Sequence, residues 1–247
     1  MKLLVCISQT PDTTANISFK DNNTVFNSEG VQFIMNPYDE WYALVRALEL
    51  KEAVGTGSVT ILNVGPSTND AVIRKGLAVG ADDAVRIDTE ALSANYVAKQ
   101  IAEYAKGKEY DIIFFGKETI DFNGAIVPSM VAEYMDLPFV SLVHNMEVSG
   151  STATLKRDVE GGVEVISVDL PLVLSASKGL AEQRIPNMKG IMMSRRKPLV
   201  VVPAADVANP VEVASYEMPP AKSAVKLIDP ENMDELVNLL HNEAKVI

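Results

Sequence analysis

The feature that most constrains the fold of this chain is a regular alternation of short apolar runs with longer helical segments. The runs are rich in β-branched residues and almost uninterrupted, which is typical of parallel strands covered on both faces. Strands that alternate with helices in this way form βαβ units. We therefore expect an α/β fold with a doubly wound, mostly parallel sheet. The expected strands are residues 3–7, 59–64, 84–87 and 112–115.

Capping signals mark the ends of the expected helices. Asn36 is expected as the N-cap of the first helix, because Pro37 then takes the first helical position, where proline is favoured. Gly55 follows the last helical turn, as glycine commonly does. The expected helices cover residues 36–55, 67–80, about 93–106 and about 123–135.

Two antiparallel additions interrupt the alternation. Residues 16–35 contain Asp21-Asn22-Asn23 between short apolar runs, which predicts a β-hairpin inserted between the first strand and the first long helix. After Pro138, strand-like runs are separated by glycine-containing turns, and this pattern predicts an antiparallel meander. The runs of the meander are residues 143–148, 153–157 and 163–168, and a last buried strand is expected at residues 172–175.

The chain loses its periodicity after about Lys189. A basic stretch leads into a segment dotted with prolines, and a final helix is expected at about residues 234–245. Residues 198–230 lack the pattern of a self-contained core, so we expect an extended C-terminal arm that lies on another chain. The predicted organisation is an α/β nucleotide-binding-type domain over residues 1–190, and a recognition helix with the arm over residues 191–247.

The charge of the chain excludes some classes of partner. It has 22 Lys and Arg against 33 Asp and Glu, a formal net charge of −11. Nonspecific binding to nucleic acid or to an anionic membrane needs a surplus of cations, so neither is expected. No apolar stretch approaches the roughly 20 residues of a membrane-spanning helix, so we expect no insertion into a membrane.

Cysteine and histidine are scarce. Cys6 is the single cysteine, which excludes an intrachain disulfide. His144 and His241 are far apart in sequence, so we expect neither a metal centre nor a hydrolytic triad. The apolar run after Met1 is too short for a signal peptide. We therefore expect a protein of the cytoplasm.

Two regions carry residues that the fold alone does not require. One is a pair of strand-to-helix transitions, residues 35–40 and 115–125. In an open α/β sheet, ligands bind beyond the carboxyl ends of the strands, and free N–H groups at a helix start attract phosphate. An ordinary capped turn explains the same pattern, so both interpretations stay open here. The other region is residues 155–166, where charged side chains surround a Gly-Gly turn.

Several motifs extend these two regions in a fixed order along the chain. The longest combines Arg157, Glu160-Gly161-Gly162, Glu164 and Pro171-Leu-Val-Leu-Ser175. With the shorter motifs, it covers essentially the whole chain, and together these residues resemble the β subunit of electron transfer flavoprotein. The shorter motifs are Asn36-Pro37-Tyr38-Asp39-Glu40, Val64-Gly65-Pro66, Gly80-Ala81-Asp82, Gly116-Lys117 with Ile120-Asp121, Arg184, and Lys189-Gly190-Ile191-Met192.

The resemblance implies a Rossmann-like fold of the adenine nucleotide α-hydrolase type, in an electron-carrier subunit with no catalytic turnover of its own. It also implies an obligate heterodimer, in which an α subunit holds the working FAD. The β subunit would bury AMP, or a second FAD in electron-bifurcating members. The heterodimer would take electrons from acyl-CoA dehydrogenases or related flavoenzymes, as in fatty acid β-oxidation, and pass them to another oxidoreductase.

The nucleotide site that the resemblance implies departs from the family in one loop. The usual amide side chain is replaced by Ile126, and Pro128 has no N–H to donate. The backbone of residues 123–127 would therefore hold a monophosphate better than a pyrophosphate, and we expect bound AMP to be weak or absent. The implied nucleotide-binding residues are Cys6, Asn36, Val64, Gly116, Asp121, Asn123, Gly124, Ala125, Ile126 and Val127.

The resemblance also implies two surfaces for partner proteins. A loop of the β subunit anchors the dehydrogenase, and Met188 falls at the apolar anchor position of the family. Charged neighbours would steer the encounter, while the apolar side chain supplies contact energy. The C-terminal arm would wrap the α subunit. The implied partner-binding residues are Arg184, Met188, Lys189 and Ile191.

Two other functions remain open from the sequence. A bifurcating β subunit would bind a second FAD, although the altered loop argues against it. A stand-alone adenine-nucleotide-binding protein, acting as a sensor or an ATP-dependent ligase, belongs to a different functional class. Against it, the first strand is followed by Ser8-Gln9-Thr10-Pro11, where such a protein needs a glycine-rich pyrophosphate loop.

Overall fold

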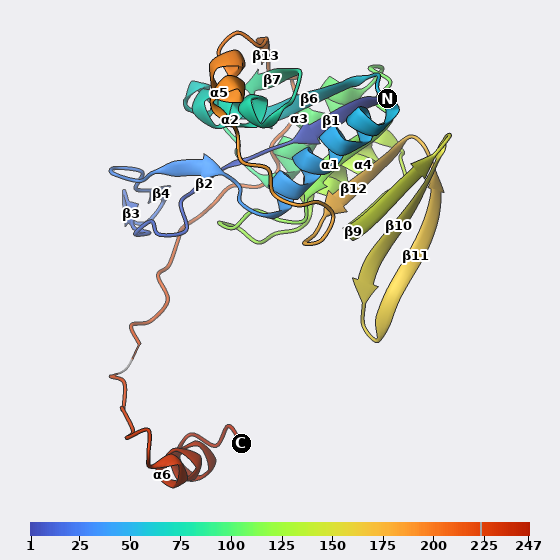
Figure 1. The fold of residues 1–247 in the computed structure, drawn as a ribbon. Coiled ribbons are helices and arrows are strands. Elements are labelled where there is room, and N and C mark those ends of the chain that lie inside the picture. The colour runs from blue at the N-terminus through green and yellow to red at the C-terminus, as the bar shows by residue number, and fades with distance from the viewer. Residues whose placement is uncertain (223) are drawn as a thin grey trace.

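The fold is organised around a nine-stranded sheet in the computed structural model, which describes residues 1–222 and 224–247 (Figure 1). Its strands are β1 (Lys2–Cys6), β6 (Ser58–Val64), β7 (Asp83–Asp88), β8 (Ile112–Gly116), β9 (Phe139–Ser149), β10 (Thr152–Val159), β11 (Gly162–Asp169), β12 (Leu172–Ala176) and β13 (Leu199–Pro203).

The strand order is β11-β10-β9-β12-β8-β1-β6-β7-β13. The strands from β9 through β12 to β13 pair in parallel, whereas β9, β10 and β11 form the expected antiparallel meander. The expected α/β fold with a doubly wound, mostly parallel sheet is therefore confirmed.

Helices cover both faces of the sheet (Figure 1). On one face, α1 (Asp39–Val54) and α2 (Asp70–Val79) share a core with Leu3 and Val5 of β1. On the other, α3 (Ala94–Ala105) and α4 (Val127–Met135) share a core with Leu4 and Cys6. Successive side chains of a strand point to opposite faces. Residues 3–6 are therefore all apolar because each of them enters one of the two cores.

The first helix begins two residues later than the sequence predicts, at Asp39 in place of Pro37. Asn36 is not its N-cap, because both ends of its amide are bound elsewhere. Its Oδ1 accepts from Ile120 N at 2.9 Å, and its Nδ2 donates to Glu118 O at 2.9 Å. The residue before α1 is Tyr38, which has a φ of 65° and makes no side-chain cap. The prediction of an Asn36 cap is therefore wrong.

The predicted starts of α2 and α3 agree with the structure, whereas that of α4 does not. α3 is capped as expected, since Ser93 Oγ accepts from Tyr96 N at 3.2 Å. α2 follows a short 3₁₀ turn, η1 (Ser67–Asn69), in agreement with a start near Ser67. α4 starts only at Val127, because Asn123 and Ala125 have φ values of 47° and 52°, which no right-handed helix accommodates. The prediction of a helix from about residue 123 is wrong for its first turn.

The expected insertion between β1 and α1 is confirmed as two small antiparallel pairs. β2 (Gln9–Pro11) pairs with β5 (Phe33–Met35), and β3 (Phe19–Lys20) pairs with β4 (Val25–Phe26). The turn between β3 and β4 uses the left-handed conformation at residues 21–23, which Asp and Asn tolerate better than other non-glycine residues.

Residues 188–203 pack against the α/β body, and the arm begins only after them. α5 (Met188–Ser194) packs against α2, and β13 pairs in parallel with β7 at the edge of the sheet. Residues 199–203 were expected to belong to the arm, and that prediction is wrong. Their apolar, valine-rich run pairs with the outer edge of β7. Pro198 precedes this run and Pro203 ends it, at a sheet edge, where proline is tolerated.

The extended arm is confirmed beyond Pro203. It leaves the body at Ala205, whose backbone N–H and C=O are both bound by the buried amide of Gln100 at 2.8 and 2.9 Å. Further along, Tyr216 stacks on Phe19 with ring centroids 4.5 Å apart. Figure 1 shows the chain then running away from the body to α6 (Met233–Asn238), which continues into the π-helical turn η2 (Leu239–Glu243).

Replacing Gln100 with Met should loosen the root of the arm. Met keeps the length of the side chain but leaves both polar groups of Ala205 without their partner, which costs about 1–2 kcal/mol in the free energy of unfolding. Urea unfolding should register the loss, and limited proteolysis should cut faster near residues 204–210. The exposed Gln183 provides the matched control: Gln183→Met should change neither readout. Equal stability of the two variants would contradict the anchoring role of Gln100.

Candidate functional site

The carboxyl ends of three neighbouring strands bring part of the predicted nucleotide site together. Cys6 ends β1, Val64 ends β6 and Gly116 ends β8, and these strands are adjacent in the order β8-β1-β6. Cys6 and Val64 are buried in the core that α3 and α4 cover, and burial raises the pKa of the Cys6 thiol. The two side chains therefore make the carboxyl ends of β1 and β6 apolar. The raised pKa keeps the Cys6 thiol protonated, so it is not a reactive thiolate.

Gly116 allows α1 to approach the end of β8 closely. A Cβ atom at this position would lie 2.8 Å from Glu40 Cγ and 2.9 Å from Glu40 N. Carbon and nitrogen atoms do not approach so closely without a bond, so any larger residue would displace the first turn of α1. Gly116 therefore fixes the distance between the helix start and the strand end.

Glu40 is a buried carboxyl group at this helix start. Ser8 holds both of its oxygens: Ser8 N donates to Oε2 at 2.7 Å, and Ser8 Oγ donates to Oε1 at 2.5 Å. Burial raises the pKa of Glu40 to about 8, against the opposing effect of the Ser8 hydrogen bonds, and the carboxylates of Asp121 and Asp39 raise it further. Glu40 is therefore largely protonated near neutral pH.

Asp39 adds a second perturbed carboxyl at the same place. Burial raises its pKa to about 6, and the nearby Lys117 opposes the rise. Sequence reasoning used Asp39 and Glu40 only as parts of a motif and missed them as site residues. The available signal was an acidic pair in the first turn of a helix that follows a strand.

The loop between β8 and α4 presents backbone donors to solvent. Residues 121–126 are all exposed, and Asp121 Oδ1 accepts from Phe122 N at 2.9 Å. Asn123 N donates to Thr119 O, so this predicted phosphate ligand is already engaged. In the part of the chain that the structure describes, the N–H groups of Gly124, Ala125 and Ile126 make no hydrogen bond.

This loop has free backbone N–H groups that suit a phosphate, but it has no side-chain donor beside them. The three free N–H groups precede the first turn of α4, where the helix dipole favours an anion. Ile126 supplies no side-chain donor, and no side chain caps the helix. The Asn36 amide, bound to Glu118 and Ile120, holds the start of the loop beside α1. The loop therefore has only backbone donors for an anion, and we call these three N–H groups the candidate phosphate cradle.

The predicted partner-binding residues lie on a separate surface, which we call the docking segment, residues 184–197. Met188 and Lys189 are exposed on α5, as is Ile191. Arg184 is not free, because its guanidinium binds Glu52 through two hydrogen bonds of 2.7 and 2.8 Å. The segment therefore presents apolar side chains and lysine while its first arginine is engaged.

Ile185 is a docking candidate that sequence reasoning missed. Its side chain is 86% exposed, more than the 74% of Met188, and it lies just before Pro186, outside any helix. It is close in sequence to Met188, Ile191 and Met192, which are also exposed. The available signal was an apolar residue inside a basic, proline-containing stretch.

The two candidate surfaces lie at opposite ends of the sheet. The nucleotide residues follow the carboxyl ends of β1, β6 and β8. The docking segment contacts the last turn of α2, next to Asp82, whose carboxylate accepts from Val59 N near the start of β6 at 2.8 Å. The candidate nucleotide site and the docking segment therefore do not overlap.

Two classes of site are not formed in the described ranges, 1–222 and 224–247. These residues include no group of three or more His, Cys, Asp or Glu side chains placed to hold a metal ion. No helix among them is long and apolar enough to cross a membrane.

Glu40→Gln should flatten part of the pH dependence of stability. The folded pKa of about 8 exceeds the ordinary value of 4.5, so the wild-type protein loses stability as the pH rises from about 4.5 to about 8. Glutamine is neutral throughout and can keep both contacts with Ser8. Urea unfolding between pH 5 and 8.5 should therefore show the variant gaining stability relative to wild type as the pH rises. Glu103→Gln, at an exposed carboxylate on α3, should run parallel to wild type. Parallel curves for Glu40→Gln as well would refute the buried neutral carboxyl.

Comparison with known proteins identifies the family. A family model described as "Electron transfer flavoprotein domain" matches residues 23–207. The chain is 36% identical over 261 residues to "Electron transfer flavoprotein subunit beta" of Bacillus subtilis, with all of both chains covered. It is 34% identical over 250 residues to the protein of that name from Syntrophomonas wolfei, covering all of this chain and 98% of that one.

A further relative bears a different name. The chain is 29% identical over 259 residues to "Caffeyl-CoA reductase-Etf complex subunit CarD" of Acetobacterium woodii, covering 99% of this chain and 98% of that one. The family model includes both the loop before α4 and the docking segment. The full-length similarity and the geometry of the body agree with the motifs of the sequence, and the chain belongs to the β-subunit family of the electron transfer flavoproteins.

Proposed function

We propose that this chain is the β subunit of a heterodimeric, cytoplasmic electron transfer flavoprotein. It acts as an electron-carrier subunit and not as an enzyme, and an α subunit holds the working FAD. The heterodimer takes electrons from acyl-CoA dehydrogenases or related flavoenzymes and passes them to another oxidoreductase. Full-length similarity to proteins named as β subunits supports this role.

The observation that carries the proposal is the C-terminal arm. Leu227 is 90% exposed and Val225 is 84% exposed, and none of the side chains of α6 is buried. A helix of six residues is not stable alone in water, because its nucleation cost exceeds what so few hydrogen bonds return. The arm therefore needs a second surface that covers its apolar side chains, and the α subunit is the partner we assign to it.

The docking segment suits a flavoenzyme with an acidic surface. Ile185 and Met188 project from a segment that also carries Lys189, Arg195 and Arg196, all exposed. The whole chain is acidic, at −11, so this local basic patch would orient an acidic partner by contrast with its surroundings. The apolar side chains then supply the contact that holds the complex.

The nucleotide cradle suits AMP better than a second FAD. Its free backbone donors, Gly124, Ala125 and Ile126, hold a single phosphate, and no side chain of the loop extends the site to a pyrophosphate. AMP would occupy the carboxyl edge above Cys6 and Val64, where its role is structural. We expect this binding to be weak because the cradle lacks a side-chain donor.

Deleting residues 206–247 should abolish assembly. Co-expression of the full chain with an α subunit of this family should yield a stable heterodimer with one FAD, whereas the truncated chain should leave the α subunit unbound. Size-exclusion chromatography with flavin absorbance measures both. Two FADs per heterodimer would instead support a bifurcating protein. A stable, ATP-hydrolysing monomer would support the stand-alone nucleotide-binding alternative.

Point substitutions in the arm test whether its apolar side chains make the contact, without shortening the chain as the deletion does. Replacing Val225 and Leu227 together with Asp should weaken the heterodimer at least tenfold, because two charges would be buried in an apolar interface. Lys226→Asp, between them, is the matched polar control and should change the affinity less. Equal effects would argue against apolar docking of the arm.

Ile126→Gln should strengthen the binding of AMP to the heterodimer. The new amide adds a donor to the phosphate cradle, and a hydrogen bond to a charged group of this kind corresponds to about a tenfold gain in affinity. Isothermal titration with AMP measures the gain. Ile185→Gln makes the same exchange at the opposite edge of the sheet and should leave the AMP affinity unchanged. No difference between the two variants would refute the assignment of the cradle.

A further inference from the structure

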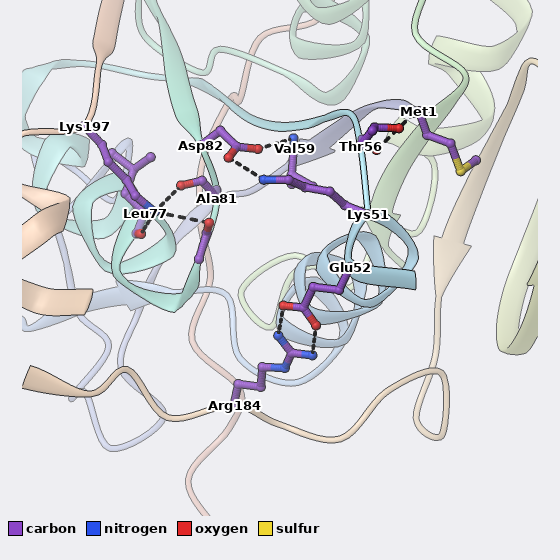
Figure 2. A network of polar contacts seen from close by, with 11 residues as sticks. Met1, Lys51, Glu52, Thr56, Val59, Leu77, Ala81, Asp82, Arg184 and Lys197 are labelled. Carbon is purple, nitrogen blue, oxygen red and sulfur yellow. Dashed lines mark hydrogen bonds and ion pairs between the residues drawn. The ribbon is translucent and has the colours of Figure 1, made fainter. Parts of the chain in front are cut away.

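The docking segment is fastened to the body at its beginning by one residue. Arg184 makes a two-pronged pair with Glu52 of α1: Nη1 donates to Oε1 at 2.7 Å and Nη2 donates to Oε2 at 2.8 Å (Figure 2). The backbone oxygen of Arg184 accepts from Trp41 Nε1 at 3.1 Å. Side chain and main chain of the residue directly before Ile185 are thus both held by α1.

The end of the docking segment is fastened to α2. Lys197 Nζ donates to Leu77 O at 3.0 Å, to Gly80 O at 3.1 Å and to Ala81 O (Figure 2). Carbonyl groups in the last turn of a helix lack helical donors, and a cation there also meets the negative end of the helix dipole. Lys197 therefore closes the C-terminus of α2 and the docking segment together.

Between these ends α5 packs on α2, and Arg74 Nη1 of α2 donates to Ser194 O at 2.7 Å. A Cβ atom on Gly190 would lie 2.4 Å from Ala78 O, so α5 meets α2 there without room for a side chain. Before this point a groove of about 570 Å³ opens beneath the segment, lined in part by Ile185 and Pro186. The position of Ile185 therefore depends on its fastening at Arg184 more than on packing beneath it.

The pair at the beginning contributes little to stability and calls for another explanation. The side chains of Arg184 and Glu52 are 36% and 58% exposed, and ion pairs of this exposure stabilise a fold only slightly. A planar guanidinium on a carboxylate does, however, fix orientation, because both hydrogen bonds must point the same way. Hydrogen bonding from Arg184 lowers the pKa of Glu52, which keeps the carboxylate ionised.

We infer that Glu52 is a positioning residue for docking: by holding Arg184 it sets Ile185 outward before the flavoenzyme arrives. The inference rests on the proposed function of the docking segment. Ordering a loop in advance lowers the cost of binding, since less freedom is lost when the complex forms. Glu52 is acidic beside a basic docking surface, so a purely electrostatic role would make its removal improve the encounter. Positioning and charge thus predict opposite signs.

The test uses the heterodimer and an acyl-CoA dehydrogenase that reduces it. Glu52→Gln should raise the apparent KM for the heterodimer about three- to tenfold and leave kcat unchanged, the range expected when one or two side chains lose their order. Glu49→Gln is the matched control: it removes the same charge one turn away, where Glu49 pairs with Arg46 and acts on Arg184 only through its charge, without a hydrogen bond. Its KM should stay the same or fall.

Two additional measurements make the outcome decisive. Hydrogen exchange of residues 184–190 in the heterodimer without dehydrogenase should be faster in Glu52→Gln than in wild type or Glu49→Gln. Exchanging the charges, with Glu52→Arg and Arg184→Glu in one chain, should restore part of the KM.

Failure of this inference is distinguishable from failure of the docking function. Ile185→Asp should raise KM more than tenfold if the segment docks the flavoenzyme. If Ile185→Asp acts but Glu52→Gln leaves KM unchanged or lowers it, the positioning role of Glu52 is overturned. If Ile185→Asp has no effect, the docking function itself is overturned, and the inference with it.

Discussion

The two-sided burial of the central strands is the constraint on which the rest of the structure depends. Every side chain of β1 from Leu3 to Cys6 is buried, alternately in the core under α1 and α2 and in the core under α3 and α4. A strand buried on both faces cannot use its sides for function, since any polar group there would lose its hydration. Ligand and partner sites are therefore confined to the two ends of the strands and to the segments added beyond them.

At the carboxyl edge, close backbone approach builds the candidate nucleotide site. Gly116 admits the first turn of α1 against the end of β8, and this approach buries Glu40 beside Ser8. Asn36 then holds the loop that follows β8 against the same helix start, through Glu118 and Ile120. A network of buried polar groups of this kind is stable only when its members are bonded, so it fixes the loop that presents N–H groups to solvent. The cradle is thus a consequence of how α1 meets the sheet.

Two added segments face solvent: the docking segment lies near the amino ends of the central strands, and the arm starts at the carboxyl end of β13. The docking segment rests on the ends of α1 and α2 through Arg184 and Lys197, and the arm leaves the body where Gln100 holds Ala205. Both expose apolar side chains that the body does not cover. The candidate nucleotide site and the candidate partner surfaces are therefore separate: the first lies at the carboxyl ends of the central strands, and the second are the docking segment and the arm.

The sequence by itself determined the α/β class, the meander, the hairpin insertion and the existence of the arm, because strand and helix periodicities are local and were legible in each segment. It also placed Cys6, Val64 and Gly116 at strand ends. The tertiary structure decided what local pattern does not encode. Asn36 serves a loop and not a helix start, residues 199–203 complete a sheet edge made by distant β7, and Arg184 is bound by Glu52, 132 positions away. Each of these depends on which groups meet across the fold, and hydrogen bonds form with the nearest free partner in space, whatever its place in the chain.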